Sequence, residues 1–251
     1  MLAVISPAKK MDFEPVENLG SSTPDFIADA NNLANHARKL SVSDLRAMMK
    51  ISEPLAQLNR ERFQAFSETP DDRATKQAAF AFAGDTYTGL QADSLSSDDL
   101  DYAQNHLRIL SGLYGVLRPL DRIQPYRLEM GRKLATKSGS TLYAYWDDRI
   151  GAALDAASDG VIVNLASNEY FKAAGKKMTS RVITPAFKEE REDGLKMIGL
   201  FAKKARGAMA RFIVQNRVET VDRLKDFNTD GYSFRADLSG ENDWVFSRVT
   251  P

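Results

Sequence analysis

The sequence contains no cysteine and only two histidines, His36 and His106. Without a thiol it cannot form disulfides, cysteine-ligated zinc sites or iron–sulfur clusters, or use a thiolate nucleophile. Two imidazoles are too few for a multi-histidine metal centre, so we predict neither a metal site nor a cofactor. No run approaches the ~18 apolar residues that span a membrane, and the N-terminus lacks the charge order of a signal peptide. We therefore expect a cytoplasmic protein without a membrane partner.

A net charge is also absent, because 34 basic and 34 acidic side chains give a formal charge of +0. The charges are nevertheless unevenly spread. Leu107–Lys133 carries a local charge of +4 and Gly194–Val218 a local charge of +6, so the remaining chain is acidic. Such polarity is typical of a protein with a localised anion site. The sequence leaves open whether the two basic segments share one surface.

The order of apolar segments predicts a mixed α/β (α+β) fold. The chain of 251 residues is long enough for a substantial core, and without a clear linker we expect one domain over residues 1–251. Short apolar runs predict strands at Leu2–Ser6, Val161–Leu165, Arg181–Phe187 and Leu195–Phe201. Capped or amphipathic patterns predict helices at Asp25–Leu40, Ser41–Met49, Ser52–Phe66, Leu142–Ala157 and Ala202–Val218.

The segment Leu107–Met130 holds the densest group of position-restricted residues. Its leucine spacing predicts that a helix runs over Ser97–Leu110 and ends in a tight turn at Gly112–Gly115. An arginine-rich return segment follows, and such a helix and turn can present backbone N–H groups to a phosphate. The alternative is a core helix, a capping turn and a loop with solvated arginines. Both interpretations stay open at this stage.

A second candidate cluster follows the predicted strand Val161–Leu165. Hydrogen-bonding side chains gather where this strand ends and a short helix begins: Asn164, Ser167, Glu169, Tyr170 and Lys172. Glu169 can serve as a general acid or base tuned by Lys172. Alternatively, Ser167 caps the helix and Glu169 complements its dipole. Lys9, after the first strand, is a further candidate for this constellation. So are Asp85 and Tyr87 in the polar run Asp85–Leu90, which we expect to form a turn or a loop.

The predicted helix Ala202–Val218 is amphipathic and has a basic face. The cations on this face are Lys203, Lys204, Arg206, Arg211 and Arg217. Three of them fall in the first turns, where the helix dipole disfavours a cation by ~0.3–1 kcal/mol. A bound anion explains this arrangement, because the dipole and the N–H groups then favour it. The alternative is a basic face that pairs with acids elsewhere in the fold.

Six runs of this sequence resemble the YaaA-type peroxide-stress-response proteins of bacteria. They are ISPAK (Ile5–Lys9), GDTYTGLQA (Gly84–Ala92), HLRILSGLYGVLRPLD (His106–Asp121), QPYRLEMG (Gln124–Gly131), NLASNEYFK (Asn164–Lys172) and FAKKARGAMARFI (Phe201–Ile213). The resemblance implies protection against hydrogen peroxide, with less DNA damage and less free iron. It also implies a family-specific α/β fold, a basic cleft, a helix-hairpin-helix element and duplex DNA as ligand. Gly112–Gly115 is the candidate hairpin.

Two functions are therefore predicted, with DNA binding ahead of catalysis. The expected contacts to duplex DNA, largely independent of base sequence, are Lys9, Arg108, Gly112, Gly115, Arg118, Arg122, Arg127, Lys172, Lys203, Lys204, Arg206 and Arg211. The alternative is an enzyme that acts on a nucleotide or a nucleic-acid base through Asn164, Ser167, Glu169 and Lys172. A module that binds an acidic protein ranks third, and no particular protein partner is predicted.

Overall fold

A mixed β-sheet forms the centre of the molecule. The computed structural model describes residues 1–16, 19–175 and 177–249. Eight strands of this described chain form one sheet in the order β11-β12-β9-β8-β1-β5-β6, with β10 paired to β9. The strands are β1 (Leu2–Ile5), β5 (Leu107–Ser111), β6 (Gly115–Leu117), β8 (Val161–Leu165), β9 (Arg181–Arg191), β10 (Gly194–Lys196), β11 (Ser233–Phe234) and β12 (Asp243–Val249). The predicted mixed α/β class is confirmed.

The middle of the sheet is parallel and deeply buried. Strand β1 pairs in parallel with β5 and β8, and β9 pairs in parallel with β8 and β12. Residues Leu2–Ile5 are at most 1% exposed. A parallel strand covered on both faces reads as a continuous apolar run, which is why the short run at the N-terminus indicated a strand. Parallel pairing also brings the carboxyl ends of β1 and β8 to the same edge.

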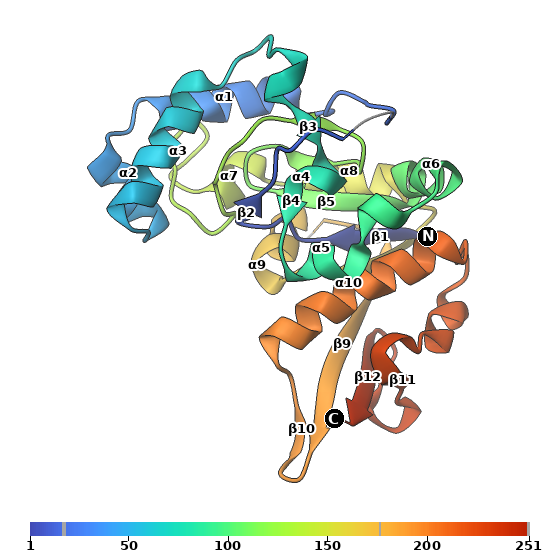
Figure 1. Cartoon of the computed structure of the whole chain (residues 1–251). Coiled ribbons are helices and arrows are strands. Elements are labelled where there is room, and N and C mark those ends of the chain that lie inside the picture. Colours follow the sequence, from blue (N-terminus) through green and yellow to red (C-terminus); the bar gives the residue numbers. More distant parts are fainter. Residues whose placement is uncertain (17–18, 176, 250–251) are drawn as a thin grey trace.

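Helices cover the sheet, and a group of them lies at one end of the molecule. They are α1 (Ile27–Arg38), α2 (Val42–Met49), α3 (Glu53–Ala65), α4 (Ala78–Ala81), α5 (Asp85–Leu90), α6 (Ser97–His106), α7 (Leu142–Trp146), α8 (Arg149–Ala157), α9 (Asn168–Phe171) and α10 (Gly199–Gln215). Short strands of two residues form two small separate sheets, which pair β2 (Lys10–Met11) with β4 (Phe82–Ala83) and β3 (Lys76–Gln77) with β7 (Arg122–Ile123). Figure 1 shows α1, α2 and α3 grouped at one end and α10 crossing beside β1 and β9. Within the described ranges, each helix is too short or too polar to cross a membrane.

Local capping explains where several helices begin. Ser41 and Ser96 each form a capping box with the aspartate three residues later. Ser52 precedes α3, whose second residue is Pro54, a position where the missing N–H costs nothing. The helices predicted over residues 25–40, 41–49 and 52–66 are therefore present with slightly shorter bounds.

The predicted helix over Ser97–Leu110 is wrong in its last turn. Helix α6 ends at His106, and Leu107–Ser111 is strand β5, which pairs with β1. Leu107, Ile109 and Leu110 are all buried, and a short run of buried leucines fits a helix or a central strand equally well. The turn Gly112–Gly115 therefore joins β5 to the antiparallel strand β6. It is a β-hairpin turn, so the expectation of a helix-hairpin-helix element at this turn is wrong.

Three other predicted boundaries differ from the structure. The polar run at Asp85–Leu90 is helix α5 and not a turn or loop. The helix predicted over Leu142–Ala157 is split into α7 and α8 at Asp147, whose φ of 46° breaks helical geometry. The strand predicted over Leu195–Phe201 ends at Lys196, and α10 begins at Gly199. Because α10 starts three residues early, Lys203 and Arg206 lie beyond its first turn, where the dipole no longer disfavours cations.

Candidate functional site

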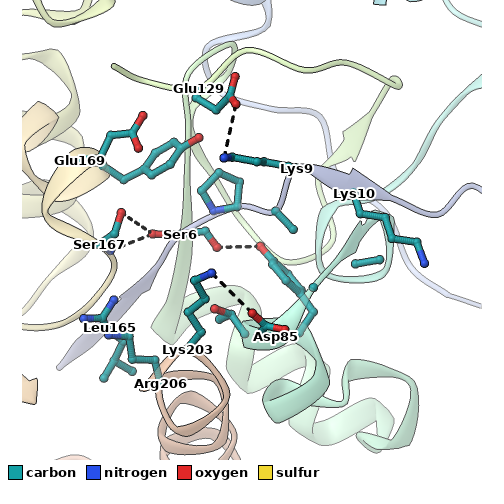
Figure 2. Close-up of a pocket in the computed structure, with 17 residues that line it drawn as sticks. Ser6, Lys9, Lys10, Asp85, Glu129, Leu165, Ser167, Glu169, Lys203 and Arg206 are labelled. Carbon is teal, nitrogen blue, oxygen red and sulfur yellow. Dashed lines mark hydrogen bonds and ion pairs between the residues drawn. The ribbon is translucent and has the colours of Figure 1, made fainter. Parts of the chain in front are cut away.

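A pocket of about 430 Å³ opens where β1 and β8 end. Ligands of α/β proteins commonly bind outside the carboxyl ends of parallel strands. Four segments and one isolated side chain form its polar walls. They are residues 6–10 after β1, Asp85–Tyr87 of α5, Ser167, Glu169 and Tyr170 at the start of α9, Lys203 and Arg206 of α10, and the side chain of Glu129. Figure 2 shows Glu129 and Glu169 on one side, with Lys203 and Asp85 across the pocket from them.

Ser6 ties three of these segments together. Its Oγ accepts a hydrogen bond from the backbone N–H of Ser167 at 2.9 Å and lies 3.4 Å from the Ser167 hydroxyl. Its carbonyl oxygen accepts from the Tyr87 hydroxyl at 3.1 Å. Burial raises the pKa of the Tyr87 phenol well above its usual value, so the donor keeps its proton. The ends of β1, α5 and α9 are thereby held at fixed positions.

Glu129 is a buried anion in the pocket wall. Its side chain is 4% exposed, and Oε1 lies 3.0 Å from Arg127, 3.4 Å from Arg132 and 3.8 Å from the Lys9 amine. Burial acts to raise the pKa of the Glu129 carboxyl, but the neighbouring guanidinium groups lower it below its usual value. In the part of the chain that the structure describes, Oε2 is buried without a hydrogen-bond partner. One ionised oxygen is therefore left to accept a hydrogen bond.

Glu169 supplies a second carboxylate, and its orientation is set by the backbone. Oε1 accepts from the Gly131 N–H at 2.9 Å, and the Tyr143 hydroxyl donates to the Glu169 carbonyl oxygen at 2.8 Å. The residue itself is exposed. Glu169 therefore presents a fixed carboxylate at the mouth of the pocket rather than a buried acid.

The opposite wall carries the cations of α10. The Lys203 amine lies 3.5 Å from an Asp85 carboxyl oxygen. Arg206 makes no hydrogen bond or ion pair with any side chain or backbone group of residues 1–16, 19–175 or 177–249, and burial alone lowers the pKa of its guanidinium. An arginine that is partly desolvated without a partner can bind an anion without breaking an existing contact.

The other predicted arginines are engaged within the fold. Arg108 donates to two backbone carbonyls of its own segment, each at 2.9 Å. Arg118 lies 3.0 Å from Asp121, and Arg122 donates to the Thr75 hydroxyl at 2.7 Å. Arg127 holds Glu129 as described. The structure therefore brings Lys9, Lys203 and Arg206 to the pocket, while the arginines of residues 108–127 support loops and strands.

Several predicted side chains lie away from the pocket. Asn164 is buried and accepts from the Ala166 N–H at 3.1 Å. The Lys172 amine lies 5.2 Å from the Tyr143 ring centre, beside a separate hollow. Lys204 lies 3.0 Å from Asp230, and Arg211 donates to carbonyls at the end of α5. Of the predicted enzymatic constellation, Asn164 and Lys172 thus lie outside the pocket. Its other members line the pocket: Lys9, Asp85, Tyr87, Ser167, Glu169 and Tyr170.

Two predicted contacts, Gly112 and Gly115, are buried in the β5–β6 turn. The backbone of Leu128 and the ring of Trp146 lie against them. A contribution of either glycine to DNA binding stays a prediction.

Sequence reasoning missed Ser6 and Glu129 as site residues. Glu129 lies in an irregular segment, where neither helical nor strand periodicity marks its surroundings. Ser6 is the last residue of the predicted first strand, and its position at a strand end was the available signal. Among the described residues, no group of three or more histidine, aspartate or glutamate side chains is placed to hold one metal ion.

The fold and the pocket define an α/β protein whose polar pocket, with cations and carboxylates on facing walls, lies at the strand ends. A family model described as peroxide stress protein YaaA matches residues 1–238. A UPF0246 protein of Dinoroseobacter shibae is 55% identical over 256 residues, covering 100% of this chain and 96% of the relative. UPF0246 proteins of Roseobacter denitrificans and Maricaulis maris are each 52% identical, with 100% of this chain and 99% and 97% of those relatives covered. The chain belongs to this family of peroxide stress proteins.

Proposed function

We propose that this member of the peroxide stress family binds duplex DNA, largely without sequence preference, and thereby limits DNA damage. The proposal places the protein in the cytoplasm and includes the lower level of free iron that the family resemblance implies. The observation that supports DNA binding most directly is the gathering of lysines at one edge of the sheet. Lys9 and Lys10 follow β1, and Lys203 and Arg206 approach the same pocket from α10.

Exposure decides which of these cations can reach a phosphate. The side chains of Lys9, Lys203 and Lys204 are 64%, 59% and 45% exposed, so each can contact DNA while remaining solvated. Their present ion pairs span 3.8, 3.5 and 3.0 Å. Partly exposed pairs of this kind contribute little to stability and are readily exchanged for phosphate. We expect the phosphate backbone to follow the rim of the pocket at these lysines, because the buried Glu129 carboxylate repels phosphate from its own wall.

Fluorescence anisotropy of a labelled duplex across a salt series tests this proposal. We expect log affinity to fall linearly with log salt, by roughly 0.9 for each phosphate neutralised. Lys203→Glu/Lys204→Glu/Arg206→Glu should weaken binding and flatten that slope. Absence of duplex binding at ~50 mM salt, where such contacts are strongest, would exclude the proposal.

A matched variant controls for the change in total charge. Lys39, Arg60 and Arg73 are exposed on the helical end of the molecule or next to it, and their side chains make no hydrogen bond or ion pair in the described chain. Lys39→Glu/Arg60→Glu/Arg73→Glu changes the charge by the same amount as the triple variant of α10. We expect it to retain the wild-type salt slope, because its cations lie away from the pocket. Equal weakening in both variants would mean that overall charge, and not the α10 edge, governs binding.

The alternative function, an enzyme that acts on a nucleotide or base, is favoured by the pocket itself. Glu129 Oε2 and Arg206 are both without partners in the described structure, on facing walls. Oriented carboxylates beside hydroxyl groups are common in sites of proton transfer. Incubation of the protein with nucleotides and with single- and double-stranded DNA, followed by mass spectrometry, tests this alternative. A product that Glu169→Gln abolishes would support catalysis, and unchanged substrates would leave DNA binding as the function.

A further inference from the structure

We infer that the pocket binds one nucleotide unit, with the phosphate at Arg206 and Lys203 and an amino group of the base at Glu129. This inference rests on the proposed function, because it identifies which part of a nucleic acid enters the site. The same chemistry is available from a free nucleoside monophosphate and from an unpaired nucleotide within DNA. Two groups that line the pocket lack partners in the described chain, the Arg206 guanidinium and the Glu129 Oε2 atom.

Arg206 forms the anion end of the site. A guanidinium binds phosphate through two parallel hydrogen bonds, and here no carboxylate or carbonyl of the described chain competes for them. The Lys203 amine, one helical turn away on α10, adds a second cation, since its only described ion pair is the 3.5 Å contact with Asp85. Both side chains line the pocket. A phosphate is therefore favoured on this wall over a neutral group.

Glu129 forms the opposite end and requires a hydrogen-bond donor. Its Oε1 already faces Arg127, Arg132 and Lys9, whereas the buried Oε2 has no partner in the described chain. Leaving a buried ionised oxygen unpaired is costly, so a bound N–H or O–H group is favoured at this point. A glutamate carboxylate accepts a hydrogen bond from the exocyclic amino group of cytosine. The site therefore suits an amino-bearing base better than a second anion.

The space between these ends suits a nucleotide. A volume of about 430 Å³ lies within the range of small-ligand pockets. Pro7, Leu165 and Tyr87 supply apolar and aromatic surface in the same walls. Unstacked bases bind between aromatic or apolar side chains while their edges form hydrogen bonds. The cations thus match the phosphate of a nucleotide, the apolar walls match the face of the base, and the carboxylate matches its amino group.

Isothermal titration of the full chain with dCMP, deoxyribose 5-phosphate and deoxycytidine tests this assignment. We expect dCMP to bind and each of the two fragments to bind about tenfold more weakly or worse, because each loses one charged hydrogen-bonding end. Arg206→Ala should weaken the binding of dCMP by at least about tenfold. Arg60→Ala, which removes an exposed arginine of α3, should bind dCMP as the wild type does. Absence of dCMP binding at ~1 mM, or equal binding by Arg206→Ala, would overturn the inference.

The base end is tested separately with Glu129→Gln, whose folding is first checked by circular dichroism. We expect this variant to lose the preference for dCMP over deoxyribose 5-phosphate. If it does not fold, the comparison of those ligands on the wild-type protein decides the point: equal affinity overturns the assignment of the base to Glu129.

Duplexes with and without one unpaired cytosine, measured on the same protein, distinguish the two sources of the nucleotide. Tighter binding of the unpaired site indicates DNA, and equal affinity together with dCMP binding indicates a free nucleotide. Loss of all DNA binding with dCMP binding intact would refute only the proposed DNA function.

Discussion

Gly89 of α5 and Gly207 of α10 lie where these two helices cross, each against the backbone of the other helix. A Cβ atom on Gly207 would lie 1.7 Å from the Thr86 carbonyl oxygen, and one on Gly89 would lie 2.0 Å from the Lys204 carbonyl oxygen. Real Cβ atoms do not approach backbone atoms so closely. The crossing therefore requires glycine in both helices. Since α5 and α10 together carry the wall that holds Asp85, Lys203 and Arg206, the crossing also sets the separation of Asp85 from the cations.

Replacement of Gly207 by alanine should destabilise the protein. In an ordinary helix, replacing glycine by alanine stabilises the protein by about 1 kcal/mol. Here the added methyl group forces α5 away from α10. Overpacking of this kind costs roughly 1–3 kcal/mol. We expect urea denaturation to show a lower free energy of unfolding. We also expect dCMP titration to show weaker binding, because the separation of the two helices displaces Lys203 and Arg206.

Gly199 offers a control in the same helix. A Cβ there meets nothing within 4 Å, so Gly199→Ala should leave stability unchanged or raise it by about 0.4–1 kcal/mol. If Gly207→Ala were as stable as Gly199→Ala, the close crossing would be wrong.

The buried Glu129 should give the protein an acid-sensitive stability. Arg127 and Arg132 outweigh burial and lower the pKa of this carboxyl below the ordinary value of 4.5. A carboxyl with a depressed pKa in the folded state stabilises the protein above its unfolded pKa, and this contribution is lost as pH falls through the folded pKa. Glu129→Gln should therefore lower the free energy of unfolding at pH 7 by roughly 3 kcal/mol, as expected when a buried pair loses one partner.

The pH dependence of that difference is the sharper measurement. As pH falls from the ordinary value of 4.5 through the lower folded-state pKa, wild-type Glu129 is protonated and the two unfolding curves should converge. Glu68→Gln removes an exposed carboxyl that has no partner in the described chain, and its curve should follow the wild type throughout. A constant gap between wild type and Glu129→Gln from pH 7 to pH 3 would show that Glu129 carries no depressed pKa.

Local sequence patterns predicted those elements that local interactions determine. Ser41 and Ser96 cap helices through contacts within four residues, and the apolar run Leu2–Ile5 can only be a buried segment. The helix prediction failed at residues 107–110 because their leucines fit both the helical and the strand periodicity. Pairing of Leu107 with Ala3, more than a hundred residues away, selects the strand. Tertiary pairing of this kind has no local signature.

The site was predicted in part for the same reason. Lys9, Ser167 and Glu169 follow strands, and a strand end is visible in the sequence. The sequence does not show that Glu129, from an irregular segment, and Arg206, from the last long helix, reach the same pocket as these residues. The local charge of residues 107–133 also did not reveal which arginines are engaged within the fold, where Arg118 pairs with Asp121 and Arg127 with Glu129.

Removal of Arg206 should separate stability from binding. This guanidinium is partly buried and has no partner in the described chain. Its charge therefore loses hydration on folding without gaining a hydrogen bond, which destabilises the folded state. We expect Arg206→Met, which keeps the apolar stem, to leave the free energy of unfolding unchanged or raise it by up to about 1 kcal/mol. Anion binding, measured with dCMP, should fall by at least about tenfold in the same variant.

Arg38→Met is the matched comparison, since this arginine is also partly buried but has partners. It donates to the Phe63 carbonyl and to the Asn35 side chain at 3.0 Å each, and also to the Phe66 carbonyl. Its loss leaves these acceptors unpaired and should cost roughly 1–3 kcal/mol. An equal loss of stability in both variants, measured by urea denaturation, would assign Arg206 a structural role. Retained stability with lost binding would mean that the chain keeps this cation for a ligand.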